Sequence, residues 1–138
     1  EHQLFPDAWS EKAILETLGQ PNTICLMAEK AGRAAGYLLA YTAADEAEIA
    51  RIAVAKELQR QGVARTLINE LEALCKSGGI RKILLDVRAG NAAARTLYVK
   101  TGFVEDGIRQ RFYDNPMEDA ILMSRPVEAG NDGAGEMK

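Results

Sequence analysis

Residues 52–64 read IAVAKELQRQGVA, and this stretch decides the fold. It begins as a short apolar strand, passes through a polar turn and enters a helix that the pattern predicts from about residue 63. The first N–H groups of a helix have no partner within it, and the helix dipole attracts anions to this end. Gly62 lets the backbone approach a ligand closely, and Ala64 adds no bulky side chain. The stretch therefore predicts a phosphate site at a strand-to-helix turn.

Taken alone, the turn leaves an alternative open. Arg60 and Arg65 can add positive charge at its mouth. The lysine of a nucleotide P-loop and the three glycines of a Rossmann loop are both missing from the segment. An ordinary strand-to-helix connection therefore explains the turn about as well.

Composition indicates one globular domain. The chain has 138 residues, of which 47% are hydrophobic and 27% charged, with a net charge of -3. This charge argues against nucleic acid as the primary partner. No apolar run approaches the ~20 residues of a membrane span, and no leader is recognisable, so a cytoplasmic protein is expected. We predict one domain over residues 1–126 and a disordered tail over 127–138, where Gly, Ala, Asn and acids dominate.

Histidine and cysteine are scarce. His2 is the only histidine, which argues against a Ser-His-Asp or Cys-His nucleophile and against a metal site. Cys25 and Cys75 are expected to be free thiols in a reducing compartment. The chemistry must then depend on carboxylates, tyrosine and backbone groups.

The hydrophobic pattern predicts an α/β or α+β fold with a mixed sheet. Ser10 reads as the N-cap of a first helix that ends near Gly19, with Trp9 packing on Ile14. The remaining order is three strands, helix, strand, helix and two strands. The predicted strands are 23–29, 35–42, 48–55, 82–88, 103–112 and 118–125, and the predicted helices are 63–76 and 91–100.

Short motifs lie along nearly the whole chain. They are FPDAWSE at 5–11, IAV at 52–54, the loop from Gln59, LDVRAGN at 85–91, LY at 97–98, GF at 102–103 and EDA at 118–120. In these motifs the chain resembles the GNAT superfamily of N-acetyltransferases, and within it the RimI type, which acetylates the N-terminal alanine of a ribosomal protein. The resemblance implies a mostly antiparallel sheet with two splayed parallel strands and helices on both faces. The family's first strand would precede Glu1, so its sheet edge is expected to be exposed or paired otherwise.

The resemblance also implies acetyl-CoA as co-substrate. In this superfamily, the CoA arm inserts like an added strand between the splayed strands. Asn91 would contact that arm, although a plain helix N-cap is the alternative. The other implied CoA-binding residues are Ile52, Ala53 and Val54 through their backbone, and Arg60, Gln61, Gly62, Val63, Ala64 and Arg65 around the pyrophosphate.

Two residues are expected to carry the chemistry. Tyr98 would protonate the departing thiolate, and its alternative is a core aromatic. Asp86 occupies the position where RimI-type enzymes carry a Glu base, so its carboxylate is one methylene shorter, and a bridging water could span the gap. The alternative for Asp86 is a solvated strand residue. Glu48 is the rival base, with Glu118 and Asp119 behind it.

The acceptor is expected to be the N-terminal α-amine of a protein, foremost an N-terminal alanine of a ribosomal protein. Tyr113 would bind the peptide, its alternative being a rim aromatic, while Phe112 replaces a tyrosine that is common in such enzymes. Direct attack in a ternary complex would suffice. Acetylation of a small amine or a lysine is the runner-up, and a non-catalytic acetyl-CoA-binding module is the third possibility.

Overall fold

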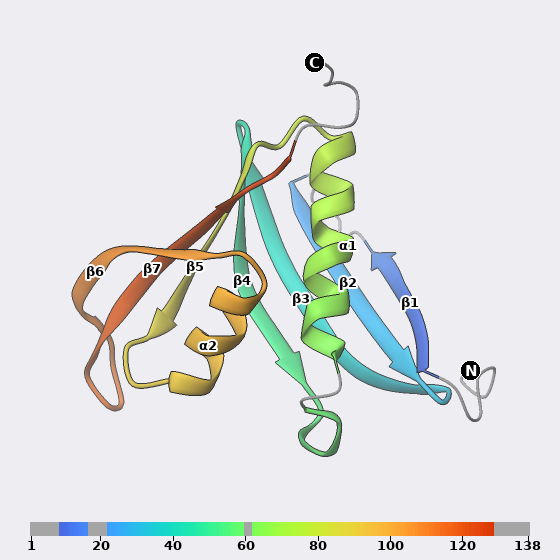
Figure 1. Ribbon diagram of the computed structural model, residues 1–138, viewed down its shortest axis with the longest axis horizontal. Helices are drawn as coiled ribbons and strands as arrows, with labels where there is room; N and C mark the ends of the chain where they lie inside the picture. Colours follow the sequence, from blue (N-terminus) through green and yellow to red (C-terminus); the bar gives the residue numbers. More distant parts are fainter. Residues whose placement is uncertain (1–8, 17–21, 60–61, 129–138) are drawn as a thin grey trace.

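The computed structural model describes residues 9–16, 22–59 and 62–128. Within them, seven strands form one sheet in the order β1-β2-β3-β4-β5-β7-β6 (Figure 1). Neighbouring strands are antiparallel except β4 and β5, which confirms the predicted mixed, mostly antiparallel fold. The elements are β1 Trp9–Glu16, β2 Thr23–Lys30, β3 Arg33–Ala43, β4 Glu46–Val54, the 3-10 turn η1 Lys56–Leu58, α1 Val63–Ser77, β5 Lys82–Arg88, α2 Ala92–Lys100, β6 Val104–Tyr113 and β7 Glu118–Pro126.

The helix predicted to start at Ser10 is wrong, because this segment is strand β1. β1 pairs antiparallel with β2, with Leu15 opposite Leu26. Without β1, one side of β2 would present a row of unpaired N–H and C=O groups. Pairing along that edge outweighs the local capping pattern, which is only a weak preference. The sheet edge that the resemblance left open is therefore covered by β1.

The strands β4 and β5 diverge halfway along their length. Their parallel register runs from Glu46 opposite Lys82 to Ile49 opposite Leu85 and ends there. Beyond this point β4 continues beside β3, while β5 continues beside β7. A register shift between β3 and β4 places Ala50 in a bulge, and bulges bend a strand away from its neighbour. The second half of β4 therefore has a free edge facing β5.

One hydrophobic core lies between the sheet and the two α-helices. Buried residues alternate along β5, where Ile83, Leu85 and Val87 face the core. Side chains of α1 and Tyr98 of α2 belong to the same core, so both helices pack on one face of the sheet. The described helices therefore do not cover both faces as the resemblance implied, because the segment predicted as the first helix is strand β1. No helix within the described residues is long and apolar enough to cross a membrane.

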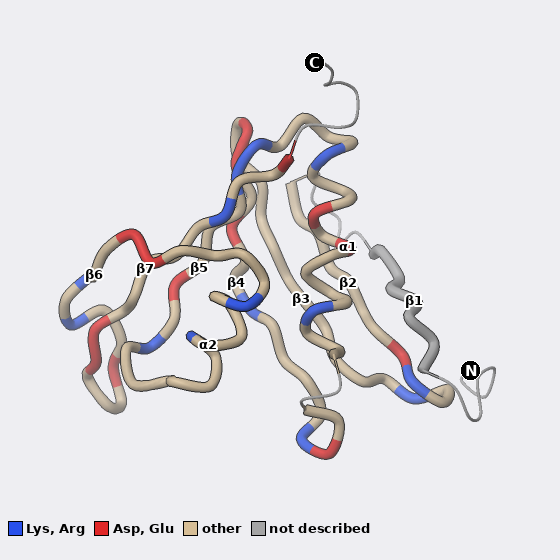
Figure 2. Tube along the Cα trace, viewed as in Figure 1, with Lys and Arg blue, Asp and Glu red and all other residues tan. Residues whose placement is uncertain are grey.

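The described residues continue for two positions beyond β7, to residue 128. Val127 follows β7 and its N–H donates to the Arg81 carbonyl at 2.9 Å. The rest of the predicted tail, residues 129–138, lies outside the described residues. Along the described elements, basic and acidic residues are interspersed (Figure 2).

Candidate active site

The start of α1 has the features of an anion site. Gly62 precedes the helix with φ of 85°, a left-handed conformation that glycine adopts without strain. The N-cap makes no side-chain hydrogen bond, and the first turn contains no acidic residue. The first helix N–H groups are therefore available to a ligand. Arg65 is exposed beside them, whereas the Val63 side chain is buried in the core.

The loop between β4 and α1 is tied back to the strand. The side-chain amide of Gln59 donates to the Val54 carbonyl at 3.3 Å. This contact fixes the beginning of the loop against the end of β4. Arg60 and Gln61, both predicted to hold the pyrophosphate, lie outside the described residues.

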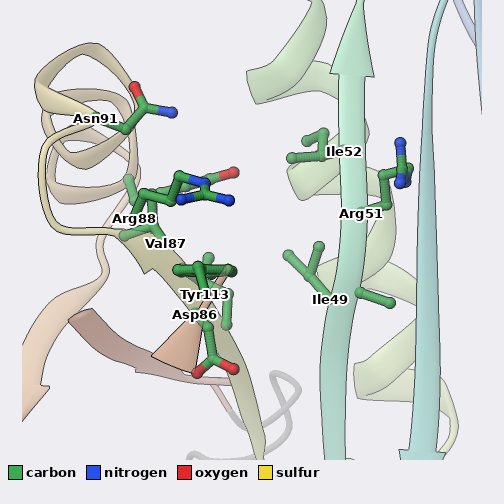
Figure 3. A pocket seen from close by; sticks show the side chains of 11 residues that line it. Ile49, Arg51, Ile52, Asp86, Val87, Arg88, Asn91 and Tyr113 are labelled. Carbon is green, nitrogen blue, oxygen red and sulfur yellow. The ribbon is translucent and has the colours of Figure 1, made fainter. Parts of the chain in front are cut away.

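A cleft of about 300 Å³ opens where β4 and β5 diverge. Ile49 and Ile52 point into it from β4, while Arg51 points away from β5 (Figure 3). The opposite wall comes from β5, the start of α2 and the end of β6 (Figure 3). Five predicted site residues line this cleft: Ile52, Asp86, Asn91, Tyr98 and Tyr113. The cleft therefore joins the predicted catalytic residues to part of the predicted CoA site.

Two other predicted residues lie at a neighbouring hollow of about 280 Å³. Ala53 and Val54 line it together with the facing part of β3, including Gly36 and Tyr37. A Cβ on Gly36 would lie 2.6 Å from the Ala53 carbonyl oxygen, so β3 and β4 approach as closely as they do only because residue 36 is glycine. The predicted CoA residues of β4 thus span both hollows.

Asp86 and Tyr98 reach the cleft from opposite faces of the sheet. Asp86 lies between the core-facing Leu85 and Val87, so its side chain points to the face that the helices leave open. Tyr98 comes from α2, on the helix-covered face. A group bound between β4 and β5 would therefore have a carboxylate on one side and a phenol on the other.

Tyr98 is both a core residue and a cleft residue. Its exposed fraction is 7%, and its ring packs edge-to-face against Phe103 with centroids 5.7 Å apart. Burial, with a smaller effect from Tyr113, raises the pKa of Tyr98 to about 12. The phenol is therefore fully protonated at neutral pH, as a proton donor must be.

Asn91 combines the two roles that the sequence left open. Its Oδ1 accepts a hydrogen bond from the N–H of Ala94 at 3.1 Å, which makes it the N-cap of α2. It also lines the cleft, on the wall opposite β4 (Figure 3). Because the cap uses only the oxygen, the side-chain NH₂ remains as a donor toward a ligand.

The acidic candidates differ in the hydrogen bonds and ion pairs that their carboxylates make. Glu118 accepts from the Gly90 N–H and pairs with Arg88 at 3.3 Å. Asp119 accepts from the N–H of Arg111 at 2.9 Å. These bonds give both carboxylates structural roles. Glu48 is exposed and pairs in register with Leu84, in the closed half of the parallel pair, and it does not line the cleft.

Tyr113 lines the cleft beside Arg88, a residue to which the sequence analysis assigned no role. The guanidinium of Arg88 lies 4.5 Å from the centre of the Tyr113 ring. The pKa of Tyr113 is raised, mainly by burial and then by the negative charge of Asp86, against a lowering effect of Arg88. Alternation along β5 could have signalled Arg88, because it shares the open face with Asp86.

The cysteines stand apart from this chemistry. Cys75 is buried in the core, and burial followed by the charge of Glu72 raises its pKa to about 11. Neither Cys75 nor Cys25 lines either hollow. A protonated thiol in the core is a poor nucleophile.

Comparison with known proteins identifies the family. The family model described as acetyltransferase (GNAT) family matches residues 1–103. The chain belongs to the GNAT acetyltransferase family. The GNAT relative from Escherichia coli strain K12, a [ribosomal protein bS18]-alanine N-acetyltransferase, is 36% identical over 125 residues, covering 89% of this chain and 82% of its own.

Two solved acetyltransferase structures have a similar fold. The crystal structure of the ribosomal-protein-S18-alanine N-acetyltransferase from Escherichia coli has a TM-score of 0.73 and 34% identity, covering 83% of this chain and 76% of that one. An acetyltransferase from Bacillus anthracis strain Ames, solved with acetyl coenzyme A, has a TM-score of 0.74 and 28% identity, covering 80% and 65%. GNAT enzymes use acetyl-CoA as acetyl donor, and a free strand edge beside an uncapped helix start suits that molecule.

Proposed function

We propose that this GNAT acetyltransferase acetylates the N-terminal α-amine of a protein, foremost the N-terminal alanine of a ribosomal protein. The observation that carries the proposal is the approach of Asp86 and Tyr98 to one cleft from opposite faces of the sheet. The similarity to the Escherichia coli alanine N-acetyltransferase supports the choice of acceptor. Such an acceptor also implies a cytoplasmic enzyme.

The donor would lie along the free edge of β4. Backbone groups of Ile52, Ala53 and Val54 would bind the amide-bearing arm as an added strand does. The pyrophosphate would meet the N–H groups at Gly62, Val63, Ala64 and Arg65, and Arg60 and Gln61 remain predicted partners from the loop. The Asn91 amide would donate to the arm from the other wall. The N–H of Val54 is the candidate to polarise the acetyl carbonyl.

The transfer needs one base and one acid. The neutral amine attacks the carbonyl carbon, the new C–N bond forms, and the C–S bond breaks. Asp86 takes the amine proton, directly or through a water, and Tyr98 gives its proton to the departing thiolate. An α-amine has a pKa near ~8, so about a tenth is already neutral at pH 7, whereas a lysine near ~10.4 is almost wholly charged. An α-amine therefore needs less help from a base than a lysine does, and a carboxylate that reaches the amine only through a water can serve it.

The acceptor is tested with peptides. The protein is incubated with acetyl-CoA and peptides that start with Ala, Ser or Met, or that have a blocked N-terminus and one internal lysine. Mass spectrometry should show the acetyl group on the N-terminus of the Ala peptide. Preference for the internal lysine would contradict the proposal, and acetyl-CoA binding without any product would favour the non-catalytic module.

The base is tested with three variants. Asp86→Asn should lower kcat and change the shape of the pH-rate profile, whereas Glu48→Gln should leave both close to wild type. Asp86→Glu restores the missing methylene and should retain more activity than Asp86→Asn. The opposite ranking of Asp86→Asn and Glu48→Gln would assign the base to Glu48, and two unchanged profiles would leave solvent as the proton acceptor.

A further inference from the structure

Arg88 holds the turn between β6 and β7 at three points. Its Nη1 donates to the Pro116 carbonyl at 3.0 Å, and its Nη2 donates to the Asp114 carbonyl at 3.1 Å. The same guanidinium covers the ring of Tyr113 at 4.5 Å. A planar group with several donors in fixed directions can make these contacts at once, whereas a lysine ammonium cannot reproduce the fork.

Glu118 fixes Arg88 from the other side. One carboxylate oxygen of Glu118 pairs with Arg88, and the other accepts from the Gly90 N–H. Gly90 immediately precedes Asn91, the N-cap of α2. The pair Arg88–Glu118 therefore links the β6–β7 turn, on the acceptor side, to the segment that presents Asn91 on the donor side.

Arg88 connects this network to the proposed active site, because it borders the cleft itself. Arg88 shares the open face of β5 with Asp86, and both residues line the cleft. Its side chain is 34% exposed, so the guanidinium is constrained by its partners while it still borders the cleft. Tyr113 lies between these groups, close enough for the Asp86 charge to affect its pKa.

We propose that Arg88 is a positioning residue that fixes the β6–β7 turn and holds Tyr113 against the acceptor peptide. The inference rests on the proposed function of the cleft. Arg88 transfers no proton and makes no contact with the acetyl group. Its loss would leave the donor edge of β4 and the Asp86–Tyr98 pair in place, while the turn and the Tyr113 ring would lose their common anchor.

Steady-state kinetics with an Ala-start peptide tests the inference. Arg88→Ala should raise the peptide KM about tenfold or more, while the acetyl-CoA KM stays within twofold of wild type. Arg88→Lys keeps the charge but loses the planar group that donates to both carbonyls, and should raise the peptide KM by about threefold or more. Arg109→Ala is the matched control, because Arg109 also stacks on an aromatic ring of this hairpin, at 4.9 Å from Phe112, and has no assigned role in the site.

Amide hydrogen exchange supplies a second measurement. Exchange of the amides of Asp114, Asn115 and Met117 should become faster in Arg88→Ala than in Arg109→Ala. If Arg88→Ala does not fold, Arg88→Lys decides by the same two measurements. A peptide KM and turn exchange equal to wild type in an active variant would overturn the role of Arg88 and leave the proposed function standing. A wild-type protein that acetylates no peptide would overturn both.

Discussion

Replacement of Tyr98 by Phe removes one hydroxyl from the cleft and keeps the ring that packs against Phe103. Because the pKa of Tyr98 is about 12, the hydroxyl is protonated in all but about one molecule in 10⁵ at pH 7. General acid catalysis contributes about 10²–10⁴ in rate. A CoA thiolate, with a pKa like that of a cysteine at ~8.5, leaves fairly easily without help. We therefore expect the lower end, about 100-fold in kcat or about 3 kcal/mol.

The assay varies acetyl-CoA and an Ala-start peptide separately for wild type and Tyr98→Phe. The acetyl-CoA KM should stay within twofold, because the hydroxyl acts on the leaving group and not on donor binding. Tyr41→Phe is the matched control, since Tyr41 is 44% exposed and lines neither hollow. A kcat within twofold of wild type for Tyr98→Phe would remove Tyr98 as the acid.

The pH-rate profile adds an independent check on Tyr98. The acid must be protonated to act, and its raised pKa extends the protonated range upward. No loss of kcat from Tyr98 is expected below about pH 11, whereas a tyrosine with the ordinary value near 10 would already have lost half its activity at about pH 10. A tyrosine-dependent fall of kcat with a midpoint near pH 10 would contradict the buried environment.

Three further predictions concern glycines and alkaline stability. Gly62→Ala and Gly79→Ala each place alanine at positive φ without a clash, so each should lower the free energy of unfolding in urea by about 1 kcal/mol. Only Gly62→Ala should weaken acetyl-CoA binding measured by calorimetry, and equal affinities of the two variants would refute the anion site. Gly36→Ala forces a Cβ against the Ala53 carbonyl and should lower the free energy of unfolding by about 2 kcal/mol. An unchanged unfolding midpoint would show that β3 and β4 can move apart at this point without loss of stability. The pKa of Tyr98 is near 10 in the unfolded chain and about 12 in the folded one, so its stabilising effect is complete below pH 10 and is lost as pH rises through 12. The free energy of unfolding of wild type should therefore fall by up to about 3 kcal/mol more than that of Tyr98→Phe across that range. An equal fall in both proteins would refute the linkage.

Most of the fold could be predicted because the local patterns agree with the tertiary structure. Strands from β2 to β7 and both α-helices lie within two residues of the predicted ranges. In β5 the alternation of Ile83, Leu85 and Val87 is the burial pattern itself. The segment at Ser10 failed because its pattern fits a helix locally, whereas its state is decided by an edge of β2 that is distant in sequence.

The site was predictable where a role depends on local sequence. Gly62 and Asn91 are recognisable as helix-start residues, and the structure places both there. Alternation along β5 could have placed Arg88 on the face of Asp86, but its contacts could not be predicted, since its carbonyl partners come from a turn 26 and 28 residues further along the chain. The hydrogen bond that Glu118 accepts from Gly90 could not be predicted for the same reason, because the two residues are 28 positions apart in the sequence.

The divergence of β4 from β5 also determines how the molecule holds together. The backbone ladder consists of two antiparallel blocks, β1 to β4 and β5 to β7, joined by four registered residue pairs between β4 and β5. The shared hydrophobic core also joins the blocks, so this short register is only the narrowest part of their backbone connection. A donor bound along the β4 edge and capped by Asn91 would bridge both blocks, and its binding free energy would add to the joint. Donor binding along this edge would therefore stabilise the contact between the two blocks.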